Sequence, residues 1–112
     1  MSRTIYVCDA GVGRRVSSRP VNFDSYIEHL HKEIQYPTTW FMQDSDTCRE
    51  MTGLLLVQGI PARPIFVEPG KKYAVNFGPT EELRVVFGFD PRNVAIIYSQ
   101  WDQQIVFTMP RL

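Results

Sequence analysis

The chain has 112 residues, of which 44% are hydrophobic and 21% charged, close to the composition of an average globular domain. Twelve Lys and Arg residues balance twelve Asp and Glu residues, so the formal net charge is zero. This balance argues against a strongly basic nucleic-acid-binding protein and against an acidic DNA mimic, because both depend on a large field of one sign. The apolar runs are too short to span a bilayer, and no signal-peptide pattern opens the chain. We therefore expect one cytoplasmic domain over residues 1–112 that does not insert into a membrane.

The charges are distributed unevenly along the chain. Residues 1–21 carry a net charge of +3, residues 22–60 a net charge of −4 and residues 61–112 a net charge of +1. An acidic middle between a basic arm and a mixed tail could give the folded domain two faces of opposite sign.

The first half of the chain predicts a strand, a loop and a helix. Residues 4–8 are rich in β-branched and aromatic residues and predict a strand, whereas residues 11–20 have the composition of a loop. Asn22 suits the N-cap of a helix that ends at Pro37. The apolar stripe of this helix consists of Phe23, Tyr26, Ile27, Leu30 and Ile34.

A second, shorter helix is predicted after residue 46. Thr47 and Glu50 form a capping-box pattern, in which each side chain satisfies a free backbone donor of the first turn. Met51 and Leu55 continue at helical spacing, and Gly59 suits a left-handed C-terminal stop.

From residue 65 onward the pattern changes to short strands. Turn-forming residues separate the β-rich runs, and residues 90–93 suit a tight turn between antiparallel neighbours. The runs are residues 65–67, 73–77, 83–89, 94–98 and 104–107. The expected fold is an α+β domain: strand, helix, helix, then a four- to five-stranded antiparallel meander, with both helices on one face of a curled sheet.

Residues 83–103 (LRVVFGFDPRNVAIIYSQWDQ) resemble the central hairpin of the RelE/HigB superfamily of toxin–antitoxin ribonucleases, and most closely its phage-type HigB-like branch. An upstream Gly59-Ile60-Pro61-Ala62-Arg63-Pro64 resembles the loop that follows the second helix in that family. The residues that match within the hairpin are Arg84, Val85, Phe87, Phe89, Asp90, Pro91, Arg92, Ala95, Ile96 and Asp102.

The resemblance implies a RelE-like fold, action on RNA or the ribosome, and a partner antitoxin. It makes Arg84 and Arg92 the candidate catalytic contacts to phosphate. The family places a Lys after the aspartate that corresponds to Asp102, whereas this chain has Gln103. An amide carries no charge and cannot transfer a proton, so this departure predicts weakened or absent catalysis.

Other residues are candidates for contact with RNA or a protein partner. Arg14, Arg15 and Arg19 form the densest positive cluster, in a glycine-containing loop that lacks the pattern of a nucleotide site. Lys71 and Lys72 follow a Pro-Gly turn. Trp40 and Trp101 are predicted on loops, where large aromatic residues either cover the core or form contact hot spots.

The sequence predicts neither a metal site nor a cofactor. His29 and His31 are two residues apart on a helix and point about 200° from each other, so they cannot share a metal. Cys8 and Cys48 are too few for a disulfide scaffold, and neither lies in a cysteine-hydrolase signature.

Two functional hypotheses follow. In the first, the protein is a toxin-like RelE/HigB-superfamily member that acts on RNA as an endoribonuclease and is neutralised by an antitoxin. In the second, it is a non-catalytic protein-binding module, such as a phage-encoded inhibitor, an immunity protein or a degenerate toxin. The zero net charge, Gln103, the acidic first helix and the aromatic residues predicted on loops favour the second. The first is preferred because only it rests on a residue-level resemblance.

Overall fold

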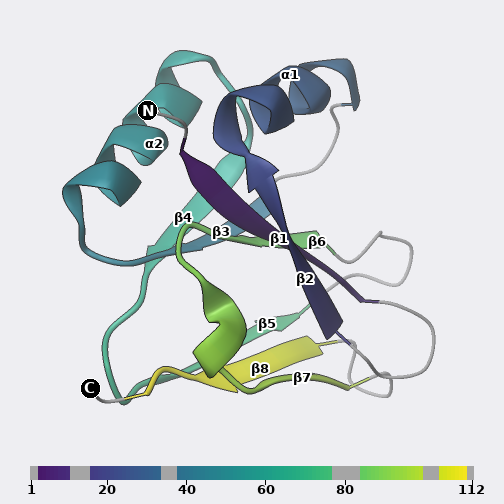
Figure 1. Cartoon of the computed structure of the whole chain (residues 1–112), viewed down its shortest axis with the longest axis vertical. Helices are drawn as coiled ribbons and strands as arrows, with labels where there is room; N and C mark the ends of the chain where they lie inside the picture. Colours follow the sequence, from purple (N-terminus) through teal and green to yellow (C-terminus); the bar gives the residue numbers. More distant parts are fainter. Residues whose placement is uncertain (1–2, 11–15, 34–37, 77–83, 100–103, 111–112) are drawn as a thin grey trace.

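The computed structural model describes residues 3–10, 16–33, 38–76, 84–99 and 104–110. Within these ranges the chain forms strands, two α-helices and one short 3-10 helix, labelled in Figure 1. In chain order these are β1 (Thr4–Ala10), β2 (Val16–Asn22), α1 (Phe23–Glu33), β3 (Thr38–Met42), α2 (Asp46–Val57), β4 (Ala62–Phe66), β5 (Lys72–Asn76), β6 (Arg84–Phe87), η1 (Pro91–Asn93), β7 (Ile96–Ser99) and β8 (Gln104–Thr108). In the described part of the chain, neither helix is long and apolar enough to cross a membrane.

The elements form three layers. A five-stranded mixed sheet in the order β2-β1-β6-β3-β4 lies in the middle, with both helices on one side. A three-stranded antiparallel sheet in the order β5-β8-β7 covers its other side (Figure 1). Strand β3 pairs in parallel with both β4 and β6, so α2 serves as the crossover between β3 and β4. The expected α+β class, with both helices on one face of a sheet, is confirmed.

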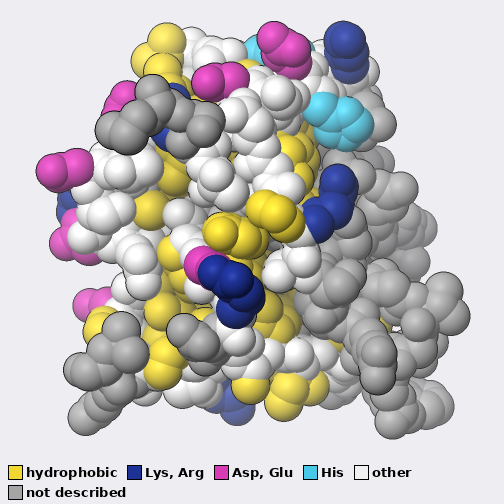
Figure 2. Space-filling model, in the orientation of Figure 1, with side chains coloured by type: hydrophobic (Ala, Val, Ile, Leu, Met, Phe, Trp, Pro, Cys, Tyr) yellow, Lys and Arg dark blue, Asp and Glu magenta, His cyan; other side chains and the backbone are white. Residues whose placement is uncertain are grey.

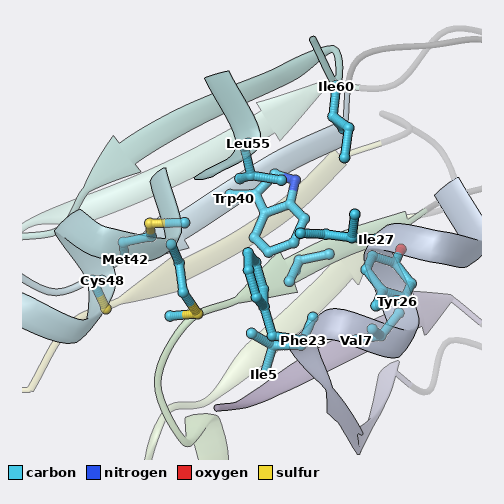
Figure 3. Close-up of a cluster of buried hydrophobic side chains, with 12 residues drawn as sticks. Ile5, Val7, Phe23, Tyr26, Ile27, Trp40, Met42, Cys48, Leu55 and Ile60 are labelled. Carbon is cyan, nitrogen blue, oxygen red and sulfur yellow. The ribbon is translucent and has the colours of Figure 1, made fainter. Parts of the chain in front are cut away.

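Alternation along the strands divides the core in two. In β1, Ile5 and Val7 belong to the cluster beneath the helices, whereas Cys8 belongs to the cluster between the two sheets. In β3, Trp40 faces the helices and Phe41 faces the second sheet, since successive side chains of a strand point to opposite faces. The inner strands β1, β6 and β3 of the five-stranded sheet therefore have apolar side chains buried on both faces. Figure 3 shows the helix-side cluster, in which Trp40 lies between residues of the two helices.

Helix α1 forms as the sequence predicts. The Asn22 side chain accepts a hydrogen bond from the backbone N–H of Ser25 at 3.1 Å and caps the first turn. Phe23, Tyr26 and Ile27 are buried, as the predicted apolar stripe requires. The predicted end of the helix, at residues 34–37, lies outside the described residues.

The start of α2 differs from the prediction. Ser45 is the N-cap, and its hydroxyl accepts a hydrogen bond from the backbone N–H of Cys48 at 3.2 Å. Thr47 therefore lies inside the first turn, and the predicted capping box with Glu50 is wrong. The predicted left-handed stop is confirmed, because Gly59 has a φ of 68°.

The order strand–helix–helix is also wrong in detail. Residues 16–20, predicted as loop, belong to β2, and residues 38–42 form β3 between the two helices. Both strands depend on partners that are distant in sequence, because β2 pairs with β1 and β3 pairs with β4 and β6. Pro20 fits into β2 because that strand lies at the edge of the sheet.

The hairpin expected from residues 83–103 is not formed. Strand β6 lies in the five-stranded sheet between β1 and β3, and β7 pairs with β8 in the other sheet. The turn residues between them form η1, which Asp90 caps through a hydrogen bond from the Arg92 N–H at 3.0 Å. Val85, Val86 and Phe87 are all buried, so β6 has two apolar faces and occupies a central position. The strands therefore do not form a single antiparallel meander.

Candidate functional site

The two arginines implied by the resemblance lie on consecutive elements of the chain. Arg84 begins β6, where its backbone is in register with Asp9 of β1, and its side chain lies outside the described part of the structure. Arg92 lies on η1 with its side chain 80% exposed. Its guanidinium is paired with the carboxylate of Asp90.

The pairing of Arg92 and Asp90 changes the properties of both groups. The hydrogen bond from the Arg92 side chain lowers the pKa of Asp90, and backbone and Tyr6 hydrogen bonds act in the same direction. The Asp90 carboxylate in turn raises the pKa of Arg92. A phosphate that binds Arg92 must therefore compete with an ionised carboxylate that already occupies the guanidinium.

The remaining predicted basic contacts do not form one cluster within the described residues. Arg19 is exposed on β2, whereas Lys71 forms an ion pair with Glu68 that raises the pKa of the lysine. Lys72 is exposed on β5. Arg14, Arg15 and Trp101 lie outside the described residues. On the face shown in Figure 2, the described cations lie apart from one another, so this face carries no continuous basic surface among them.

Trp40 is not a loop residue available to a partner. It belongs to β3 and has no exposed surface. Its ring meets Phe23 edge-to-face at a centroid distance of 6.1 Å and Tyr26 at 5.9 Å (Figure 3). The prediction of Trp40 as a contact residue is therefore wrong, because the parallel strand β3 is buried on both faces.

The described titratable groups do not gather into a catalytic or metal-binding cluster. Cys8 and Cys48 are buried on opposite sides of the central sheet. His31 shares a 3.0 Å hydrogen bond with Gln58, and His29 packs against the Tyr26 ring. Among the residues that the structure describes, no three His, Cys, Asp or Glu side chains are close enough to hold a metal ion.

A groove lies where the two sheets face each other at the β4 and β5 side of the molecule. Its volume is about 310 Å³. The five-stranded sheet contributes Thr39, Arg63 and Ile65, and the three-stranded sheet contributes Ala74, Val75 and Asn76. The Arg63 guanidinium donates a hydrogen bond to the Thr39 hydroxyl at 3.2 Å. The groove therefore combines an apolar wall, two neutral polar side chains and one cation.

Sequence reasoning did not identify this groove. Its residues come from three separate segments, and only the strand pairing brings Thr39 into register with Arg63. The one signal in the sequence is Arg63 itself, an isolated cation in the apolar run of residues 59–67. Ile60 and Val67 are buried near the two ends of this run, whereas Arg63 is exposed on β4 at the edge of the sheet.

The chain was compared with protein-family models, with curated proteins and with solved structures, and none of these comparisons finds a significant match.

Proposed function

We propose that this protein is a non-catalytic protein-binding module, and that the groove between β4 and β5 is its binding surface. The observation that carries the proposal is the environment of Arg63. Arg63 is exposed, and its guanidinium donates a hydrogen bond to the Thr39 hydroxyl. No acidic side chain among the described residues forms an ion pair with it. An arginine beside an apolar wall is typical of a protein–protein contact, where it can bind a carboxylate through two hydrogen bonds.

The pairing of Arg92 with an acidic residue and the net charge of the chain support the same proposal. RNA cleavage of the RelE type depends on cations aimed at the scissile phosphate, and Arg92 is already paired with Asp90. The zero net charge also gives little general attraction to RNA. We further propose that the protein acts in the cytoplasm, because its two cysteines are separate, buried thiols.

Affinity capture with matched baits tests this proposal. The baits are the wild-type chain, the Arg63→Glu variant and the Lys32→Glu variant, which makes the same charge change on α1. We expect one protein to be retained by the wild type and by Lys32→Glu and lost with Arg63→Glu. Equal retention by all three baits would contradict the assignment of the groove.

A RelE/HigB-type ribonuclease is the second candidate, in which an antitoxin would be the protein partner. The observation in its favour is the solvent-exposed guanidinium of Arg92 within the segment that resembles the family. It predicts that the purified protein degrades mRNA, with or without ribosomes, and that Arg84→Ala and Arg92→Ala slow the reaction. Intact RNA after incubation with the wild-type protein would rule this candidate out.

A further inference from the structure

We propose that an extended acidic segment of a partner protein adds as a fourth strand to the free edge of β5 and fills the adjacent groove. The inference rests on the proposed function and specifies the chemistry of the partner. Added strands gain affinity from backbone hydrogen bonds and specificity from alternate side chains. The edge of β5 offers both free backbone groups and side chains that can select a partner.

The backbone of β5 presents unpaired groups in a regular pattern. Strand β5 pairs with β8 on one side only, and the backbone N–H of Met109 donates to the Lys71 carbonyl at 3.0 Å. Along an antiparallel strand, the backbone N–H and C=O groups of successive residues point alternately toward and away from the neighbouring strand. The groups that point away from β8 are therefore those of Lys72, Ala74 and Asn76. No strand in the described part of the chain pairs with these groups. Within the described residues, the edge is therefore open to a further strand.

The neighbouring edge, β4, is blocked at its centre. The Val67 N–H donates to the Met42 carbonyl at 2.8 Å, and the Thr38 N–H donates to the Pro61 carbonyl at 3.2 Å. By alternation, Arg63 and Ile65 pair with β3, and Pro64 faces the open side. Proline has no N–H to donate, so β4 cannot offer a continuous set of donors. The two edges line one groove, but only β5 is suited to accept a strand.

The side chains around this edge select for an acidic partner. The described residues of β4 and β5 include two cations, Arg63 and Lys72, and no acidic residue. Arg63 and Ile65 are two positions apart on one face of β4, a separation of about 6.6 Å, which equals that of alternate residues in an added strand. The groove thus fits a segment with an acidic residue at one inward position and an apolar residue at the next.

Synthetic peptides titrated into the full, isotope-labelled chain test the inference by NMR. The probe is a short capped peptide of repeating Glu-Thr-Val-Thr, and its matched control has Lys in place of Glu. We expect the Glu peptide to shift the amide signals of Ala74 and Asn76 and the Lys peptide to leave them unchanged. Arg63→Ala should weaken binding by about tenfold or more, whereas Lys32→Ala should leave the affinity unchanged.

Backbone methylation of the peptide tests strand addition without altering the protein. Two versions carry N-methyl groups on alternate residues, so that only one of them loses the N–H groups that face β5. We expect one version to lose binding and the other to retain it. Equal binding by both versions would overturn the inference, as would displacement of the peptide by a single-stranded oligonucleotide. Self-association of the chain that the peptide cannot reverse would overturn it too, because a second copy would then occupy the edge.

The variant Ala74→Pro separates this inference from the proposed function. Proline removes the N–H of residue 74. Because that group faces away from β8, the pairing of β5 with β8 should persist. We expect Ala74→Pro to lose any partner captured in an Arg63-dependent manner. If a folded Ala74→Pro variant keeps that partner, strand addition is wrong but protein binding stands. If no partner depends on Arg63, the proposed function itself fails. If the variant does not fold, the methylated peptides decide the question.

Discussion

Gly88 packs directly against Cys48 where α2 meets the central sheet. The Cys48 thiol lies 3.6 Å from the carbonyl oxygen of Gly88. A Cβ atom on Gly88 would lie 3.3 Å from both the Cys48 sulfur and the Met42 side chain. Close packing, and not backbone conformation, therefore disfavours a larger residue at this position.

Gly88→Ala should lower the free energy of unfolding by about 1–3 kcal/mol, because the added methyl group overpacks the contact with Cys48. Urea denaturation measures this change. Gly53→Ala is the matched control, since a Cβ there meets nothing within 4 Å. In the middle of α2 it should raise the free energy of unfolding by about 0.5–1 kcal/mol. If Gly88→Ala leaves the free energy of unfolding unchanged, α2 can shift to make room for the methyl group.

Ser45→Ala should destabilise the protein by about 1 kcal/mol, because it removes the acceptor for the Cys48 N–H at the start of α2. Thr47→Ala provides the control, since Thr47 is exposed within the first turn, and its effect should stay within about 0.5 kcal/mol. Thermal and urea unfolding of both variants compare the two positions. The opposite ranking would restore the capping box predicted from the sequence.

Trp40→Ala should lower the free energy of unfolding by about 3–5 kcal/mol, because it leaves a cavity beneath both helices. Trp40→Phe should cost less, since the buried indole nitrogen has no hydrogen-bond partner among the described residues. The folded Trp40→Phe variant should also bind the Glu-containing peptide with unchanged affinity. A loss of binding without a loss of stability would contradict the structural role of Trp40.

The pairing of Asp90 with Arg92 predicts a pH-dependent contribution to stability. The pKa of Asp90 is lowered in the folded protein from an ordinary value of 3.8. The stabilisation is therefore present above about pH 4 and is lost as the pH falls through the lowered pKa. Wild type should be more stable than Asp90→Asn at neutral pH, and the difference should shrink under acidic conditions.

Urea unfolding of both proteins between about pH 7 and about pH 3 measures this difference. High salt should also reduce it at neutral pH, because the pair is exposed and ions screen it. A difference that stays constant across the pH range would contradict a role for the ionised carboxylate. No difference at neutral pH would mean that Asp90 acts through its capping of η1, a role that asparagine can fill.

The helices were predictable because their signals are local. Asn22 caps α1 within its first turn, and the apolar stripe repeats with the helical period. The position of α2 was also correct, but its first residue was not, because Ser45 and Thr47 are both good caps and lie two residues apart. In the structure the Ser45 hydroxyl accepts the Cys48 N–H, so the helix begins at Asp46 and includes Thr47.

The positions of the later strands could be predicted from the sequence, but their pairing partners could not. Residues 84–87 and 96–99 are strands as expected, yet they lie in different sheets. Strand β3 was missed because it is buried on both faces, so Trp40, Phe41 and Met42 form a continuous apolar run without alternation. The same limit applies to the groove, whose one cation, Arg63, stood out in the sequence only within a loop motif.

The sequence by itself determined the α+β class, the two helices, the left-handed stop at Gly59 and the balance of charge. Each of these depends on residues within a few positions of one another, or on composition alone. Only the tertiary structure decided which strands pair, which aromatic residues are buried and where the groove lies. The reason is physical: the backbone hydrogen bonds of a strand are completed by residues elsewhere in the chain, so its neighbours and its open edges follow from the complete fold. Arg63 and Asn76 line one groove because β4 and β5 are edge strands on the same side of the protein.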